Sequence, residues 1–537
     1  MGKSHKIIAK STGYVIISVM KNSKLDLPES KAELRKIILS QIKEIERLDH
    51  TISLLRKALF APKSEKKPLG ESPQLPLFDM PENPPDKEDD KEVVVVPEHT
   101  RKKRGRKKLP DNLPRVEVVH DIPDEEKTCG CGCELSRIGE EVTEKLDIIP
   151  AQIRVIRHIR LKYACKNCEG VEDDGDAVKI ASPPAQIIPK GIATAGLLAH
   201  ILTGKFCDAL PFYRQEKQFI RLGINIPRQS MCNWAMKAAE YCETIIKLLL
   251  EDIRGGPLIN VDETPVQVLA EPGRKATQKS YMWVFRGGTP AKPVVIYQYH
   301  PTRSGDVAKL FLTDYRGIVQ TDGYKGYDFL DTWHDIIHVA CWAHARRKFI
   351  EVKNAGGAKK TGSADKALAM IARLYALERH ARQNKFSPDK IYSMRQEQAK
   401  PVLAKIKSWL DKRKNQVPPK SLLGRAINYC LNQWQRLENY IKDGHAGIDN
   451  NLAENTIRPF VVGRKNWLFS GTPMGARASA LLYSLIETAK ANNLEPYSYL
   501  RYLFEKLPTT PTEDMGNLLP TKLTAMDLLL PDIITGV

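Results

Sequence analysis

The sequence predicts a multidomain protein that combines α+β and α/β parts. The chain has 537 residues, which is enough for several domains and at least one large hydrophobic core. Its composition changes along its length, from a proline-rich acidic stretch to a basic run and then a cluster of cysteines. Beyond residue 250, strand-like apolar runs that carry an acid are followed by long charged helical patterns. We therefore expect small N-terminal modules and one larger core.

The charge of the chain points to a polyanionic partner. The formal net charge is +19 and the isoelectric point is about 9.3, which favours nucleic acid over an acidic small molecule. A basic protein of the membrane surface is the alternative. No run of eighteen or more apolar residues is present, so no membrane span is predicted. The short apolar segment "GYVIISVM" does not fit a secretory signal, and we expect a cytoplasmic location.

Leucine and isoleucine residues recur between Ser30 and Ala61 at alternating spacings of three and four. This is a heptad pattern of about four repeats, which predicts a leucine-zipper-like helix. A proline-rich segment follows and leaves the helix no obvious core within its own chain, so an oligomerising coiled coil is favoured over packing on the same domain. The seam consists of Leu34, Ile38, Ile45, Leu48, Ile52, Leu55 and Leu59.

A solvated linker and a basic run follow the predicted zipper. Residues 62–100 are rich in proline and acidic side chains and show little periodicity. Residues 101–115, "RKKRGRKKLPDNLPR", contain eight basic residues and one acidic residue. Arg104 and Arg106 flank a glycine and can place two guanidinium groups in a narrow minor groove. We expect DNA contact here, with a solubilising charge run as the alternative.

Five of the ten cysteines lie within forty residues and predict a zinc module. Cys165 and Cys168 form a C-x-x-C pair, and "CGCGC" supplies Cys129 and Cys131, with Cys133 as an alternative ligand. Four thiolates on β-hairpins suit tetrahedral Zn²⁺, and "AQIRVIRHIRLKYAC" reads as a strand between the two cysteine groups. A redox pair or buried free cysteines are the alternatives.

Residues 190–250 predict a helical region that resembles a helix-turn-helix. A first helix, a turn through Gly223 and Pro227, and a second helix can be followed in "LPFYRQEKQFIRLGINIPRQSMCNWAMKAAEY". Arg228, Gln229 and Asn233 would lie near the start of the recognition helix and contact DNA. Any two-helix packing unit gives the same pattern, so this remains the alternative.

Two apolar segments carry an acid on or at the end of a predicted strand. "GPLINVDETPVQVL" contains Asp262 and "RGIVQTDGYKGYDFL" contains Asp322, with the strand patterns "YMWVFRG" and "PVVIYQYH" between them. This order suggests a ribonuclease-H-like core, in which neighbouring strands hold carboxylates side by side. Such carboxylates can bind Mg²⁺ or Mn²⁺ together with a substrate phosphate. The alternative is that these acids are turn formers, Asp322 in particular.

A third acid is expected from a helix facing these strands. In "DNNLAENTIRPFVVGRK" a helix is predicted to begin with Asp449 or Asn450 as its N-cap and to end near Pro459, with Glu454 in its middle. Glu454 would complete the metal site, unless it only pairs with Arg458 one turn later. Three basic residues are expected to hold the DNA phosphates that share the metal: Arg458, Arg464 and Lys465.

Several motifs taken together resemble the transposases of the insertion sequence 66 family of bacterial mobile elements. They are "VDETPVQVL", "QTDGYKGYD", "CWAHARRKF" and "NNLAENTIRPFVVGRKNWLFSG", followed by "SLIETAKANNLEPYSYL". The resemblance covers most of the chain and implies a DDE transposase whose triad falls on Asp262, Asp322 and Glu454. Such enzymes use Mg²⁺ or Mn²⁺ to cleave at transposon ends and then direct the 3′-hydroxyl at target DNA.

The resemblance also implies partners and further motifs. We expect double-stranded DNA, a homo-oligomer formed through the N-terminal helix, accessory proteins of the same element, and a nucleoid-associated location in a bacterium. "CWAH", Cys341 to His344, matches a C-x-x-H signature found after the second acid in many DDE transposases. We interpret it as a strand-to-helix junction. Metal ligation is the alternative, and it is disfavoured because one such motif supplies only half a metal site. The "CGCGC" motif departs from the C-x-x-C of many relatives.

Two other functions remain open at this stage. The chain could be a catalytically inactive DNA-binding relic or regulator, or a structure-specific nuclease on the same core. The predicted divisions are 1–61 (zipper), 62–115 (linker and basic run), 116–175 (zinc module), 176–250 (helix-turn-helix-like region), 251–345 (first part of the core), 346–443 (helical insertion), 444–490 (helix with the third acid) and 491–537 (C-terminal tail).

Overall fold

The computed structural model describes residue 30 and residues 153–164, 178–355 and 362–528. The chain divides into two compact units, Met1–Leu77 with Ala185–Val537, and Phe78–Pro184. Among the described residues, the first unit contains a five-stranded sheet with its helices, and the second contains a short hairpin. The heptad seam, the basic run and all five clustered cysteines lie outside the described residues.

The hairpin pairs β1 (Lys162–Ala164) with β2 (Val178–Ile180). The two strands are antiparallel, with Lys162 opposite Ile180. The predicted strand is therefore shorter than the alternating pattern suggested, since residues 153–161 are in no strand. These residues are exposed. The alternating apolar side chains of this segment therefore do not pack on a core as the predicted strand would require.

The sheet of the large unit has the order β5-β4-β3-β6-β7. The antiparallel strands β3, β4 and β5 follow one another in sequence, whereas β6 and β7 run parallel to β3. The apolar runs recognised in the sequence form these strands, and the central residues of β4, β6 and β7 are buried. Their bounds are β3 Leu258–Gln267, β4 Lys279–Thr289, β5 Lys292–His300, β6 Gly317–Thr321 and β7 Ile336–Ala340.

The crossovers between the parallel strands are helical. Helix α6 (Gly305–Phe311) leads from β5 to β6, and the 3-10 segment η2 (Lys325–Thr332) leads from β6 to β7. Several helices of the unit begin at a hydroxyl side chain that accepts a hydrogen bond from a first-turn N–H group. These N-caps are Thr194, Ser304, Ser387, Ser421 and Thr472.

Helix α14 (Pro473–Ala491) covers the edge strand β5. The N–H of Val295 donates to Thr488 Oγ1 at 3.0 Å, and the N–H of Tyr297 donates to Ser484 Oγ at 2.8 Å. Backbone groups that would otherwise be unpaired at the sheet edge are thus satisfied by side chains of a buried helix face.

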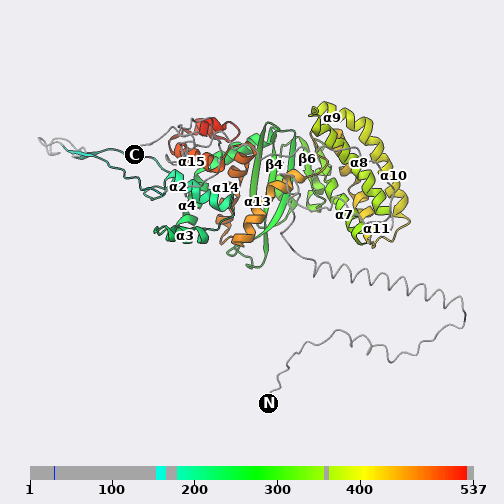
Figure 1. The fold of residues 1–537 in the computed structure, drawn as a ribbon, viewed down its shortest axis with the longest axis horizontal. Coiled ribbons are helices and arrows are strands. Elements are labelled where there is room, and N and C mark those ends of the chain that lie inside the picture. Colours follow the sequence, from blue (N-terminus) through cyan, green and yellow to red (C-terminus); the bar gives the residue numbers. More distant parts are fainter. Residues whose placement is uncertain (1–29, 31–152, 165–177, 356–361, 529–537) are drawn as a thin grey trace, which may run out of the picture. The chain divides into compact units, whose positions relative to one another are not determined.

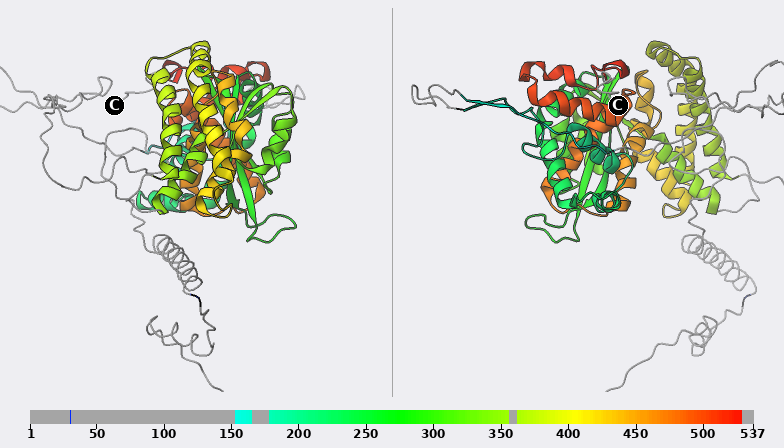
Figure 2. Two further views of the ribbon diagram at one scale, coloured as in Figure 1. Left: turned by 90° about the vertical axis from the view of Figure 1, so that its right-hand side faces the viewer. Right: turned by 60° about the vertical axis from the view of Figure 1, so that its left-hand side comes forward.

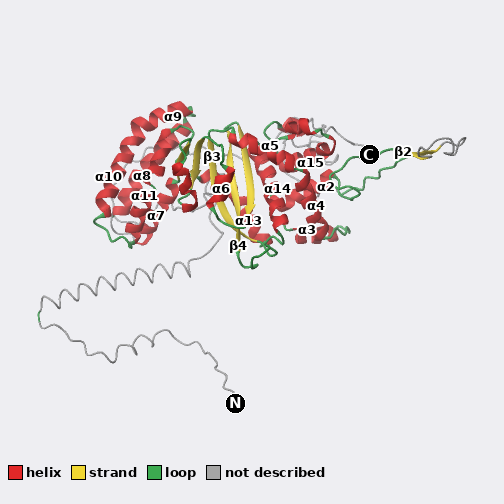
Figure 3. Cartoon of the chain, turned by 180° about the vertical axis from the view of Figure 1, so that it is seen from behind, coloured by secondary structure: helices red, strands yellow, loops and turns green. Residues whose placement is uncertain are grey.

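The predicted helices of residues 190–250 are present. They are α2 (Ala195–Phe206), α3 (Phe212–Arg221), α4 (Arg228–Tyr241) and α5 (Glu243–Arg254). Gly223 lies between α3 and α4 with φ of 77°, a conformation that favours glycine. Figures 1 and 3 show α2, α3 and α4 near α14 and α15 (Pro496–Lys506), at one end of the sheet.

A helical segment separates β7 from the helix that carries Glu454. It packs at the opposite end of the sheet, beyond β6, and stands forward in the left view of Figure 2. Its buried side chains form a hydrophobic cluster of their own, which continues onto β6 and β7. The helices are α7 Trp342–Ala355, α8 Ser363–Gln383, α9 Pro388–Met394, the π-helical η3 Arg395–Ala399, α10 Lys400–Lys414, α11 Leu422–Asn432, α12 Trp434–Glu438 and the 3-10 segment η4 Asn439–Lys442.

Arg395 fixes the return of the chain from this segment. Its side chain is 2% exposed and binds both carboxylate oxygens of Glu378, at 2.8 and 2.7 Å. The same guanidinium donates to the carbonyl oxygens of Tyr440, Asp443 and Ala446. One buried arginine therefore connects α8 to the stretch that leads into the next helix.

The predicted bounds of the helix that carries the third acid are wrong. This helix, α13, spans Asn451–Trp467. The helix continues through Pro459 instead of ending near it, and Glu454 lies in its first turn instead of its middle. Proline removes the hydrogen bond to the carbonyl of Asn455, but Asn455 is exposed, so water can satisfy that group. Packing of the opposite face on β3 and β4 then carries the helix onward.

We expect Arg395→Ala to destabilise the protein by about 3–5 kcal/mol, because it leaves buried Glu378 and three carbonyls without their donor. Thermal and urea unfolding would measure the loss. The matched control is Arg373→Ala, an exposed arginine of α8. Equal effects of the two changes would contradict this role for Arg395.

Candidate active site

Asp262 lies within β3, and Asp322 directly follows the neighbouring parallel strand β6. The register pairs Leu258 with Ile318 and Asn260 with Gln320, so two residues further along Asp262 falls beside Asp322. Asp322 is the first residue after β6, as its sequence pattern predicted, and Asp262 lies within β3. The carboxylate of Asp262 accepts the N–H of Glu263 at 2.8 Å.

Three buried amide side chains, which we name the amide cluster, hold the start of α13 against these strands: Asn260, Gln320 and Asn450. Asn260 Nδ2 donates to Gln320 Oε1 at 3.0 Å and to Asn450 Oδ1 at 2.9 Å. Asn450 in turn donates to the carbonyl oxygen of Val261 at 3.0 Å. All three are at most 2% exposed. Because Asn450 is the N-cap of α13, the cluster fixes Glu454 one turn later.

The electrostatics of the site favour a cation. Burial raises the pKa of Asp262 well above its usual range, and the charges of Glu263, Asp322 and Glu454 raise it further. Glu454 is 7% exposed, so its charge is poorly screened. The carboxylate oxygens of Asp262, Asp322 and Glu454 are the hard ligands that Mg²⁺ and Mn²⁺ prefer, and the donor set therefore fits such an ion.

Glu263 belongs to a separate ion pair that the sequence did not reveal. Side chains alternate along a strand, so Glu263 points to the opposite face of β3 from Asp262. Its carboxylate accepts hydrogen bonds from Arg303 Nε at 2.6 Å and from the hydroxyl of Tyr327. Arg303 also stacks on Tyr324, 3.8 Å from its ring centroid, and Tyr324 N–H donates to Asp322. This group joins the loop after Asp322 to β3.

His344 contacts Glu454 directly. Its Nε2 is 3.0 Å from Glu454 Oε1, and the nearest donor atoms of Cys341, His344 and Glu454 lie within 4.8 Å of one another. Burial raises the pKa of Cys341 to about 12, so it is a neutral thiol, and its sulfur accepts the N–H of Asn450 at 3.2 Å. The expected strand-to-helix junction is confirmed, because β7 ends at Ala340 and α7 begins at Trp342.

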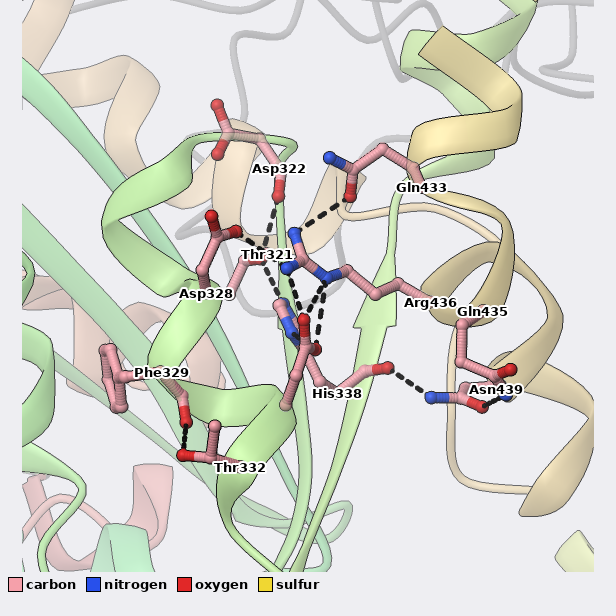
Figure 4. Close-up of polar contacts among 11 residues, drawn as sticks. Thr321, Asp322, Asp328, Phe329, Thr332, His338, Gln433, Gln435, Arg436 and Asn439 are labelled. Atoms are coloured by element: carbon pink, nitrogen blue, oxygen red, sulfur yellow. Dashed lines mark hydrogen bonds and ion pairs between the residues drawn. The ribbon is translucent and has the colours of Figure 1, made fainter. Parts of the chain in front are cut away.

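A polar relay that is buried at Thr321 and His338 and reaches the exposed Asp331 lies behind Asp322 (Figure 4). Thr321 Oγ1 is 2.8 Å from the carbonyl oxygen of Asp322 and 2.9 Å from His338 Nε2. His338 Nδ1 is 2.7 Å from Asp331 Oδ1, and Arg436 of α12 binds the same carboxylate through Nε at 2.9 Å. The relay thus connects the helical segment to the main chain of the second acid.

The residues predicted to contact DNA differ in their exposure to solvent. Arg228 and Gln229 are exposed at the start of α4. Lys465 is exposed on α13, whereas Arg464 is partly buried and donates to Thr264 Oγ1 of β3 at 3.0 Å. Arg458 is also partly buried on α13. The predicted Arg104 and Arg106 and the zinc ligands Cys129, Cys131, Cys165 and Cys168 lie outside the described residues.

Comparison with known proteins decides the family. A family model described as "Transposase IS66 family" matches residues 190–478, which is more than half of the chain. The chain belongs to the IS66 transposase family. Further models of the same family match residues 47–118 ("Transposase C of IS166 homeodomain"), 126–169 ("zinc-finger binding domain of transposase IS66") and 484–521 ("IS66 C-terminal element").

Relatives of this IS66 transposase occur in Sinorhizobium fredii (strain NBRC 101917 / NGR234). The chain is 35% identical to "Uncharacterized protein y4jD" over 77% of its own length and 81% of the relative. It is 32% identical to "Uncharacterized protein y4qI", over 78% of each chain. The zinc-finger match covers all five clustered cysteines and supports zinc binding, and membership of a transposase family implies action on DNA. Within the described residues, no helix is long and apolar enough to cross a membrane.

In metal-free protein we expect Asp262→Asn to raise the melting temperature at neutral pH. The folded-state pKa of Asp262 is raised, so the acid destabilises the folded protein increasingly as pH rises from the usual aspartate pKa to the raised pKa, above which the loss is complete. The difference from wild type should disappear as pH falls below the usual aspartate pKa, where the acid is protonated in both states. Melting curves in a chelator at several pH values measure this.

The control for that experiment is Asp314→Asn. Asp314 is exposed with φ of 64°, a conformation that asparagine also adopts. If Asp262→Asn lowers the melting temperature at neutral pH, or shifts it as little as the control does, the buried charge of Asp262 does not destabilise the folded protein.

Arg436→Met should raise the pKa of His338, because it removes a positive neighbour that lowers this pKa alongside burial. Histidine titration by NMR measures the shift, with the exposed Arg425→Met as the control. An unchanged pKa of His338 would mean that Arg436 is not electrostatically linked to the relay.

Proposed function

We propose that this IS66 transposase is a DDE enzyme that performs metal-dependent cleavage at transposon ends and joins the freed 3′-hydroxyl to target DNA. Asp262, Asp322 and Glu454 are its catalytic acids. The observation that carries the proposal is the strand register, which sets Asp262 beside Asp322, together with the effect of the Glu454 charge on Asp262. These acids come from three separate segments, and the charges of Asp322 and Glu454 both raise the pKa of Asp262, which supports a shared site.

The sheet supports a ribonuclease-H-like core. Three antiparallel strands in sequence followed by two strands parallel to the first, in the order β5-β4-β3-β6-β7, are typical of that fold. The helices between β7 and α13 would then be an insertion between the second and third acids. This arrangement allows the segment before Glu454 to vary in length, because the amide cluster and not the insertion determines where α13 begins.

The proposed mechanism assigns each acid the role of a metal ligand. Asp262, Asp322 and Glu454 would hold Mg²⁺ or Mn²⁺, which would supply Lewis-acid chemistry for an in-line displacement at phosphorus. The chain contributes the geometry: β3 and β6 hold two carboxylates, α13 holds the third, and His344 orients Glu454 by hydrogen bonding. No side chain is assigned as general base, and no covalent enzyme intermediate is involved.

The proposed partners follow from charge and family. Lys465 on α13 and Arg228 and Gln229 on α4 are exposed and would contact the phosphates or bases of double-stranded DNA. Arg458 and Arg464 would act nearer the acids. We further propose a homo-oligomer formed through the N-terminal zipper, accessory proteins of the same element, a nucleoid-associated location, and a Zn²⁺ site formed by Cys129, Cys131, Cys165 and Cys168.

The decisive experiment is strand transfer with precut DNA ends taken from the flanks of the native gene, in Mg²⁺ or Mn²⁺. Wild type should give joined products and Asp262→Asn should give none, since losing a metal ligand removes the chemistry. Binding without cleavage or joining, even with the neighbouring accessory proteins added, would indicate a DNA-binding relic. Cleavage without joining would indicate a nuclease.

Glu454→Gln should retain DNA binding and lose strand cleavage by at least about 10²-fold, a magnitude typical of removing an electrostatic catalytic group. Gel-shift titration and a nicking assay on the same preparation separate the two effects. The control Glu251→Gln changes an exposed acid of α5 and should leave both unchanged. Parallel loss of binding and cleavage in Glu454→Gln would argue against the metal-ligand role.

A further inference from the structure

The C-terminal end of α13 displays two apolar side chains, Leu468 and Phe469, which we name the apolar tip. Leu468 is 64% exposed and Phe469 is 44% exposed. Leu269, which follows β3 by two residues, adds a third exposed apolar side chain at 38%. Isolated exposed apolar residues need no explanation, but these lie on segments joined by hydrogen bonds at the end of the helix that carries Glu454.

The backbone at Leu468 is strained. Its φ of 67° and ψ of −52° lie where residues other than glycine are rare. The N–H of Phe469 donates to the carbonyl of Trp467 at 2.9 Å, which closes a γ-turn of the rare, strained form. Glycine would adopt this conformation without steric strain, yet the chain has leucine at this position. Strain of this kind is characteristic of functional sites.

The apolar tip is also held firmly. Ser470 N–H donates to Gln267 O at 2.9 Å, and Leu269 N–H donates to Ser470 O at 3.0 Å. Val268 and Ser470 form a parallel bridge. The loop therefore extends β3 and shares its rigidity, so that little conformational entropy would be lost when the exposed side chains contact a partner.

The chain segment that contains the apolar tip carries basic residues and no acid. Between residues 455 and 486 the chain has no acidic residue. Lys465 and Arg477 are exposed on either side of the tip in sequence. Basic residues around apolar side chains suit DNA, whose phosphates attract the cations and whose bases accept apolar wedges between their steps. A neutral protein surface or a second copy of this basic chain offers no such match.

The length of α13 between Glu454 and Leu468 predicts where along the DNA the apolar tip makes contact. Leu468 is fourteen residues beyond Glu454, which is about 21 Å of helix. For a duplex that runs along α13, this length corresponds to roughly six base-pair steps. We propose that the apolar tip inserts against the base stack of the bound DNA about six base pairs from the cleaved phosphate, and distorts the duplex there. This inference rests on the proposed function, since the DNA is the one whose strand lies at the three acids.

The test uses the full chain and duplexes of the native gene flank that carry 2-aminopurine at successive positions. Wild type should increase the fluorescence at one or two positions about six base pairs from the cleavage site, because unstacking relieves quenching. Phe469→Ala and Leu468→Gly should lose that increase while the distant exposed control Met526→Ala keeps it. No bright position in wild type, or the same bright position in both tip variants, overturns the inference.

Leu468→Gly guards against misfolding as an explanation. Glycine accepts the positive φ of residue 468, so this variant should melt at or above the wild-type temperature while losing the fluorescence increase. A large drop in melting temperature would contradict the strained turn on which the inference depends. If the tip variants instead change the molar mass measured by light scattering and keep the fluorescence increase, the tip binds a second copy and the inference fails.

Failure of this inference can be told apart from failure of the proposed function. Asp262→Asn should keep the fluorescence increase, because the tip acts in binding, while strand cleavage is lost. Cleavage by wild type without a fluorescence increase refutes the tip alone. Absence of cleavage and joining in wild type, with the increase present, refutes the proposed chemistry and leaves the tip as a DNA contact.

Discussion

The contact on which the site depends is the buried amide cluster of Asn260, Gln320 and Asn450. Amide groups removed from water are costly unless each finds a partner, and here each satisfies another across three segments. An apolar cluster would bury the same surface without specifying a position, whereas these hydrogen bonds allow one arrangement of β3, β6 and α13. Glu454 can therefore be held where its charge acts on Asp262, because its helix is anchored by groups that carry no charge.

The helical segment between β7 and α13 is tied to the core by the same kind of chemistry. Arg395 binds three carbonyls of the returning chain, and Arg436 binds the acids of the η2 crossover. The His338 relay then passes from this ion pair to the main chain beside Asp322. The segment is thus more than an appended bundle, since its polar contacts end at the peptide group of a candidate metal ligand. A shift of these helices would therefore act on the main chain of Asp322 through this series of hydrogen bonds.

Local patterns were sufficient to predict β3, β4, β5 and β6, the helices of residues 190–250, and Asp262 and Asp322 within or directly after their strands, because each depends on a short apolar run and its flanking residues. Pro459 misled the prediction of where α13 ends, since packing on β3 and β4 outweighs one missing hydrogen bond. The amide cluster could not be predicted: its members lie 60 and 190 residues apart and no spacing links them. The contact of His344 with Glu454 spans 110 residues and was missed for the same reason.

This long separation along the chain has a consequence during synthesis. Asn260 must wait for Asn450 before its second hydrogen bond can form, and at 5–20 residues per second translation takes roughly 10–40 s to cover that interval. While residues 323–453 are synthesised, about a quarter of the chain, the nascent protein carries Asp262 and Asp322 without Glu454. A product terminated before residue 454 lacks Glu454, and one terminated before residue 450 also lacks the asparagine that anchors the start of α13 to β3.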